Sequence, residues 1–284
     1  MYPTALVALD LSPAEGPMLD CLADLRDLGV ARVILCHVIR VGYAQGAGFG
    51  HEAEYRTWLE GHATRLREAG LDVVVDIRTA GQPAEEILIA AAEHEADLIV
   101  IGSRGQSMLR GLFLGSTARE VIRRAEQPVR LEWINATAEG TAEACARACT
   151  GRLERLVLAT DLSPEADPAE AAAIDLSPGR HVDLVHVLAE ADHTRYPRWP
   201  AMARAALDAI AAEVAAAGGT ATPHLIDGTP SEAVATLAGA RDAQLIVVGK
   251  HGQNRVAGIV IGSTADALCA IARRPVLVVP VAIG

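Results

Sequence analysis

Two stretches of this chain combine glycines, hydroxyl side chains and the start of a helix in a way that suits an anion. One is VVGKHGQNRVAGIVIGSTADA, residues 247–267, which contains the pattern G-x2-G-x9-G-[ST]. Glycines let a ligand approach the backbone closely, and the free N–H groups at a helix start attract phosphate. The hydroxyls of Ser263 and Thr264 could cap the helix or bond a phosphate oxygen. The pattern predicts a phosphate-binding loop, with ordinary turns and caps as the alternative.

The same pattern occurs a second time, nearer the N-terminus. Each copy directly follows an apolar run that is typical of a strand. Arg104 lies in the first loop, and Lys250, the only lysine of the chain, lies in the second. These side chains could balance the charge of a phosphate or point to solvent. The residues that form the two patterns are Gly102, Gly105, Gly115, Ser116 and Thr117, and then Gly249, Gly252, Gly262, Ser263 and Thr264.

The loops belong to a longer internal repeat. LVALDLSP recurs as LVLATDLSP, VILCHV recurs as VDLVHV, and the segment that precedes each glycine loop also returns, at a nearly constant offset. Self-similarity of this extent indicates a duplicated domain. The repeat predicts one domain over residues 1–136, a linker over 137–151 where the pattern breaks, and a second domain over 152–284.

Within each copy, short apolar strands alternate with amphipathic helical stretches, which is the pattern of a parallel sheet covered by helices. The fold class predicted is therefore α/β, with two tandem doubly wound domains, each a five-stranded parallel sheet with helices on both faces. The strands are expected at 5–9, 32–38, 73–78, 97–101 and 129–133, and again at 154–159, 181–187, 221–226, 244–248 and 276–280. In the first copy the helices are expected at 14–28, 52–69, 83–94 and 116–126.

In such a sheet, ligands bind beyond the carboxyl ends of the strands, where the strand order reverses. This rule selects the loops after the first, second and fourth strands of each half. Asp10 and Asp161 follow the first strands and could face a ligand there, or could act only as helix caps. His37 and His186 end the second strands, and a structural role is the better interpretation of an isolated histidine.

Composition excludes several classes of function. A formal net charge of −11 argues against general affinity for nucleic acid, and no apolar run is long enough for membrane insertion, so a cytoplasmic protein is expected. Neither GxxxxGK[ST] nor a GxSxG elbow occurs, which removes the main support for a P-loop NTPase and an α/β-hydrolase. The cysteines have no metal-ligand spacing; Cys36 and Cys269 are expected to be buried free thiols.

The residues quoted above resemble the universal stress protein family, in its tandem form with two domains in one chain. The resemblance covers the strand-one openings, the HV pair that ends strand two, and both glycine loops with their helices. It implies an adenine nucleotide alpha hydrolase-like Rossmannoid fold and ATP as the ligand. No metal centre is predicted from the sequence, although Mg²⁺ could arrive with a nucleotide triphosphate. The resemblance further implies that Asp10 and Asp161 lie near the adenine and ribose, that the backbones of Val38 and Val187 meet the adenine, and that the glycine loops hold the phosphates and ribose.

The resemblance also implies antiparallel contact of the fifth strands, so that the two halves form a pseudo-dimer within one chain. A homodimer and an unidentified protein partner are further expectations. The leading functional hypothesis is an ATP-binding regulatory protein of stress adaptation. The alternatives are a slow ATP hydrolase, and a nucleotide-free scaffold whose loops stay empty.

Overall fold

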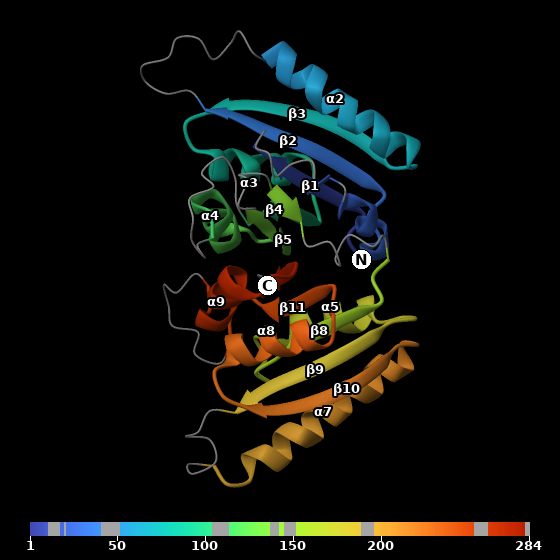
Figure 1. The fold of residues 1–284 in the computed structure, drawn as a ribbon, viewed down its shortest axis with the longest axis vertical. Coiled ribbons are helices and arrows are strands. Elements are labelled where there is room, and N and C mark those ends of the chain that lie inside the picture. The colour runs from blue at the N-terminus through green and yellow to red at the C-terminus, as the bar shows by residue number, and fades with distance from the viewer. Residues whose placement is uncertain are drawn as a thin grey trace. The chain divides into compact units, whose positions relative to one another are not determined.

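A computed structural model describes residues 1–10, 18–19, 21–40, 52–103, 114–136, 142–144, 152–188, 196–252 and 261–281. The chain divides into two compact units, Met1–Ala144 and Cys145–Gly284. Each contains a five-stranded parallel sheet, and the elements of both are labelled in Figure 1. The α/β fold class, with two doubly wound domains, is therefore confirmed.

In the first unit the strand order is β3-β2-β1-β4-β5, so the order reverses between β1 and β4. The strands are β1 (Thr4–Leu9), β2 (Arg32–Arg40), β3 (Asp72–Ala80), β4 (Leu98–Gly102) and β5 (Val129–Glu132). The helices are α2 (Glu52–Glu68), which packs on β2 and β3, and α3 (Pro83–Glu93) and α4 (Ser116–Arg124), which pack on each other.

The second unit repeats this plan with the order β10-β9-β8-β11-β12. The strands are β8 (Arg155–Ala159), β9 (His181–Leu188), β10 (Thr220–Asp227), β11 (Leu245–Gly249) and β12 (Val276–Val279). The helices are α5 (Asp167–Leu176) and α7 (Trp199–Ala216), which contact each other, and α8 (Pro230–Ala240) and α9 (Ser263–Ile271), which form a second pair. Figure 1 shows α7 running alongside β10.

The central strands are apolar on both faces because helices cover both sides of a parallel sheet. Leu98, Ile99 and Val100 of β4 are all fully buried, and so are Ile246 and Val247 of β11. A strand that was exposed on one face would alternate instead. The continuous apolar runs therefore explain why these two strands are interior strands of their sheets, beside the point where the order reverses.

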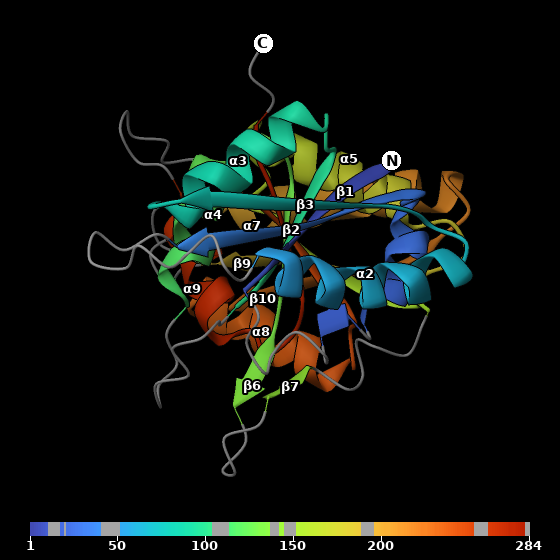
Figure 2. The same cartoon turned by 90° about the horizontal axis from the view of Figure 1, so that it is seen from above.

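Two segments differ from the expectation. Of the helix expected at 14–28, residues 14–17 and 20 lie outside the described residues, and Cys21–Leu28 form the 3₁₀ helix η1. Leu22, Leu25 and Leu28 are all fully buried, and their spacing of three suits a helix with three residues per turn. Near the expected linker, β6 (Ile134–Ala136) and β7 (Ala142–Ala144) pair antiparallel as a separate small sheet, which Figure 2 shows as a short ribbon of its own.

Candidate functional site

In the second unit, the glycine loop closes on itself at its base. The backbone N–H of Lys250, the residue after β11, donates to the carbonyl of Val279 at 2.7 Å. The N–H of Gly262, directly before α9, donates to the carbonyl of Lys250 at 2.7 Å. These two hydrogen bonds hold the ends of the loop together at the carboxyl end of β11. This is the edge of the sheet, next to the reversal of strand order, where ligands bind in such folds.

The first unit closes its loop in the same way. Ser103 follows β4, and its N–H donates to the carbonyl of Glu132 at 2.7 Å, while the N–H of Gly115 donates to the carbonyl of Ser103 at 2.9 Å. The Ser103 hydroxyl also accepts from the N–H of Ile134 at 2.9 Å. Arg104 and Gly105 lie outside the described residues, so the interior of this loop is not part of the description.

Both loops deliver the chain into a helix without a proline and without a side-chain cap. Gly115 is the N-cap of α4 and Gly262 is the N-cap of α9, and neither helix has a side-chain cap hydrogen bond. In contrast, α3, α5, α7 and α8 each have a proline at the first or second position, which removes one of the free N–H groups. The starts of α4 and α9 therefore keep the N–H groups and the positive dipole end that suit an anion.

The serines and threonines that follow the last glycine of each loop lie inside the helices and not at the N-cap positions. Because the glycines are the N-caps, Ser116 and Ser263 are the first helical residues, and Thr117 and Thr264 follow them. The interpretation that these hydroxyls cap the helices is therefore wrong. Ser116 and Ser263 are exposed, and the two threonines are half-buried.

Asp161 lies directly against the second glycine loop. A Cβ atom built on Gly252 would overlap Oδ2 of Asp161, so a hydrogen at this position is what lets the carboxylate reach the loop. Oδ1 of Asp161 accepts from the hydroxyl of Ser163 at 2.6 Å and from its N–H at 3.2 Å. The helix-cap alternative for Asp161 is wrong, since α5 begins only at Asp167 and has Ala166 as its N-cap.

Lys250 is buried, at 7 % exposure, so the alternative in which its side chain points to solvent is wrong. Gly249, at the end of β11, is also confined: a Cβ there would lie 3.1 Å from the carbonyl oxygen of His251. Gly262 is less tightly enclosed, with the carbonyl oxygen of Lys250 at 3.3 Å from a built Cβ. The second loop is therefore compact around its base.

The two histidines tie strand two to strand one in each unit. The Nδ1–H of His37 donates to the carbonyl of Leu9 at 2.9 Å, and that of His186 donates to the carbonyl of Thr160 at 3.0 Å. Both rings are buried, and each meets an aromatic ring edge-on, Tyr55 at 5.1 Å and Trp199 at 5.7 Å. Burial lowers the pKa of His37, against a smaller opposite effect of its hydrogen bond and of nearby Asp10. These contacts support the structural interpretation of both histidines.

Val38 and Val187 lie one residue past these histidines. The pairing of β1 with β2 ends at Leu9 and His37, so Val38 pairs only with Arg78 on β3. In the second unit, β8 pairs with β9 only as far as Val185, whereas Val187 remains paired with β10. The backbone groups of Val38 and Val187 that face the first strand therefore have no ladder partner on that strand. They lie level with Asp10 and Asp161, which follow the first strands.

Sequence reasoning missed one pair at this edge. The hydroxyl of Thr160 donates to Oε1 of Glu170 at 2.5 Å, and the N–H of Leu162 donates to Thr160 Oγ1 at 2.9 Å. Burial is the main cause of a raised pKa at Glu170. The hydrogen bond from Thr160 acts in the opposite direction, whereas the charges of Asp167, Asp161 and Glu213 raise the pKa further. A signal was present, because the corresponding residues of the first half are both leucines, Leu9 and Leu19.

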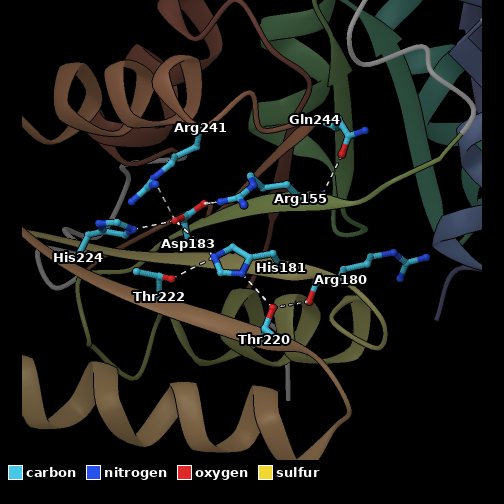
Figure 3. Close-up of polar contacts among 9 residues, drawn as sticks. All are labelled: Arg155, Arg180, His181, Asp183, Thr220, Thr222, His224, Arg241 and Gln244. Carbon is cyan, nitrogen blue, oxygen red and sulfur yellow. Dashed lines mark hydrogen bonds and ion pairs between the residues drawn. The ribbon is translucent and has the colours of Figure 1, made fainter.

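A separate charged cluster joins β8, β9 and β10 (Figure 3); Arg155 and Asp183 lie near the amino ends of β8 and β9, and His224 lies in the middle of β10. Asp183, fully buried, accepts from Nη1 of Arg155 at 2.9 Å and from Nε2 of His224 at 2.7 Å. Nε of Arg241, at the end of α8, lies 3.6 Å from Oδ1. Burial, followed by the charge of Arg155, lowers the pKa of His181 in this cluster. These contacts join three strands to the end of a helix, so the cluster has a structural role.

Cys36 and Cys269 are buried free thiols, as expected, and burial raises the pKa of Cys36 to about 12. Within the described residues, no three or more His, Cys, Asp or Glu side chains are grouped in a way that could hold a metal ion. Among these same residues, no helix is both long and apolar enough to cross a membrane.

Two parallel α/β units, each with a closed glycine loop at its switch point, define a tandem protein of the Rossmann-like class. The chain belongs to the universal stress protein family, whose sequence profile matches residues 1–131 and again residues 152–280. The resemblance seen in the sequence is thus confirmed.

Relatives of similar length are known. Universal stress protein Rv2623 of Mycobacterium tuberculosis is 26 % identical over 292 residues, covering 96 % of this chain and 95 % of that protein. A universal stress protein of Mycolicibacterium smegmatis is 31 % identical over 218 residues, 74 % of this chain and 69 % of that one. The crystal structure of a universal stress protein from Archaeoglobus fulgidus has a TM-score of 0.73 at 23 % identity, covering 98 % of this chain and 96 % of that chain, and so shares its fold.

Proposed function

We propose that this protein is an ATP-binding regulatory protein of stress adaptation, with one adenine-nucleotide site at the switch point of each half. The observation that carries the proposal is the loop architecture of the second unit. Its glycine loop is closed by the bond between Gly262 and Lys250, opens into an uncapped helix, and has the carboxylate of Asp161 against Gly252. A triphosphate needs N–H donors, and a ribose hydroxyl needs a carboxylate acceptor.

The first site has the same loop closure through Ser103 and Gly115 and the same uncapped start of α4. The first turn of α4 contains no acidic residue, which favours an anion there. Gly102 ends β4 beside this loop, and Asp10, half-buried, follows β1. Two sites in one chain is therefore the simplest proposal.

In this proposal, ATP occupancy orders the glycine loops and changes which protein partner docks. The ribose and adenine would lie toward the aspartates and toward the backbones of Val38 and Val187, with Mg²⁺ arriving on the phosphates. A cytoplasmic location, the pseudo-dimer through the fifth strands and a possible homodimer remain predictions from the sequence. Nothing in the described sites favours slow ATP hydrolysis as a second function.

The test is a calorimetric titration of ATP with Mg²⁺ into the wild type and into Gly115→Val and Gly262→Val. Each valine places a bulky side chain at the base of one loop. The ATP affinity of that site should fall by roughly tenfold or more, so that each variant shows one binding event where the wild type shows two. Gly239→Val is the matched control, because Gly239 lies in α8 with nothing within 4 Å of a built Cβ. Full binding by both loop variants would overturn the proposal, and a single-turnover assay with labelled ATP would expose slow hydrolysis.

A further inference from the structure

The turn after β8 is held by a hydrogen bond between buried Thr160 and half-buried Glu170, a pair that has no counterpart in the first half. Thr160, at 6 % exposure, donates its hydroxyl proton to Oε1 of Glu170. Its oxygen then accepts the N–H of Leu162. The carboxylate on α5 thus fixes the direction of the threonine hydroxyl, and the hydroxyl in turn holds the backbone two residues later.

Leu162 needs such support because its backbone is left-handed, with φ of 60°. A residue with a side chain pays about 1–2 kcal/mol for this conformation, so it persists only where surrounding contacts determine it. The acceptor on Thr160 is the contact that satisfies the Leu162 N–H in this conformation. Without Glu170, the threonine hydroxyl could rotate to another partner and release that N–H.

The conformation of this turn determines where the Asp161 carboxylate points. Asp161 lies between Thr160 and Leu162, and its Oδ1 is held by Ser163, immediately after the left-handed residue. Its Oδ2 lies against Gly252 in the glycine loop. A change in the backbone of Leu162 would move both anchors of Asp161 together, and so withdraw the carboxylate from the loop.

The first half replaces both members of the pair at once. Leu9 stands at the position of Thr160 and Leu19 at that of Glu170, and both leucines are buried, at 5 % exposure each. Exchanging only one member would leave a half-buried carboxylate or a buried hydroxyl without its partner, which costs stability. The joint exchange therefore indicates that Thr160 and Glu170 act as a unit.

We propose that Glu170 is a positioning residue of the second nucleotide site: through Thr160 it holds the Leu162 turn and keeps the Asp161 carboxylate against the glycine loop. The first site lacks this device, so the two sites of the chain differ in what controls their affinity. The inference rests on the proposed function in naming ATP as the ligand. The effect of Glu170 on the turn itself stands without it.

The test uses the full chain with Gly115→Val, so that ATP titration reports the second site. Glu170→Ala should lower its ATP affinity by roughly three- to tenfold, the effect of one lost hydrogen bond, and should speed amide exchange at Leu162 by a similar factor. Glu170→Gln should restore both values to within about twofold, because its side-chain carbonyl still accepts from Thr160. Glu213→Gln removes a neighbouring charge without touching Thr160 and should leave both unchanged.

A double variant, Thr160→Leu with Glu170→Leu, separates positioning from folding. It installs the apolar pair of the first half and leaves neither a carboxylate nor a hydroxyl without its partner, so its unfolding temperature should fall no further than that of Glu170→Ala, while its second-site affinity should fall as in Glu170→Ala. Parent-like affinity in this variant, or unchanged Leu162 exchange in Glu170→Ala, would overturn the inference. Amide exchange is measured without nucleotide, so a chain that binds no ATP would refute the proposed function while exchange still decides the role of Glu170.

Discussion

The carboxylate of Asp161 and the α-carbon of Gly252 lie in contact across the second switch point, although the two residues are 91 positions apart in the sequence. The strand order accounts for this contact, since β8 and β11 are neighbours and their carboxyl ends lie at one edge of the sheet. Glycine at 252 is thus required by the close approach of the carboxylate, not by the turn alone.

Gly252→Ala should therefore weaken ATP binding at the second site. The added methyl group would force Asp161 away from the loop, and the expected loss of affinity is about tenfold. Titration in the Gly115→Val background measures it. Gly239→Ala is the control, with open space around a built Cβ, and it should bind ATP as the parent does. Equal affinity of the two alanine variants would show that Asp161 does not help to hold the ligand.

Removing Asp183 should destabilise the second unit strongly. Its fully buried carboxylate pairs with Arg155 and His224, and Asp183→Ala would leave both groups without their acceptor. The expected loss is roughly 3 kcal/mol, the lower end for a broken buried pair because Arg155 is partly exposed. Urea unfolding followed by circular dichroism measures this loss.

Asp208→Ala provides the matched control for that loss. Asp208 pairs with Arg204 one turn away on the surface of α7, and exposed pairs of this kind contribute about 0.3–0.5 kcal/mol. If both alanine variants lowered the unfolding free energy by similar amounts, the cluster around Asp183 would not have the structural importance assigned to it.

Most of the fold followed from the sequence because each element is locally specified. The apolar runs that became β4 and β11 need burial on both faces, which an interior position in a covered parallel sheet provides. The 3₁₀ geometry of residues 21–28 was missed, although the spacing of Leu22, Leu25 and Leu28 by three residues contained the signal.

The site was predictable only in part. The glycines and Asp161 followed from the repeat, whereas the bond between Thr160 and Glu170 depends on how α5 packs against β8. The partners of Asp183 depend on strand register, because Thr222 pairs opposite it on β10 and Val157 opposite it on β8. No local pattern specifies contacts of this kind.

Two glycines outside the loops should respond to alanine in opposite directions. Gly61 lies inside α2 with nothing within 4 Å of a built Cβ, so Gly61→Ala should stabilise the protein by about 0.5–1 kcal/mol. Gly219 precedes β10, and a Cβ there would lie 2.7 Å from the carbonyl oxygen of Ser177. Gly219→Ala should therefore destabilise by about 1–3 kcal/mol. Chemical denaturation measures both, and a gain at Gly219 would contradict the close packing described.

The buried ring of His37 should make the first unit less stable in acid. Its pKa in the folded state is lowered, chiefly by burial, so the neutral ring is favoured there relative to the unfolded chain. Its contribution to stability is therefore fully present above about pH 6.5, the unfolded value, and is lost as the pH falls through the folded pKa. His37→Asn is the matched variant, because its side chain keeps an N–H that can reach the Leu9 carbonyl but has no titrating group.

Between about pH 7 and pH 5, the wild type should lose unfolding free energy relative to this variant. An NMR titration of the His37 ring should give a midpoint below 6.5. A midpoint above that value would mean that the hydrogen bond to Leu9 and the nearby Asp10 carboxylate together outweigh burial.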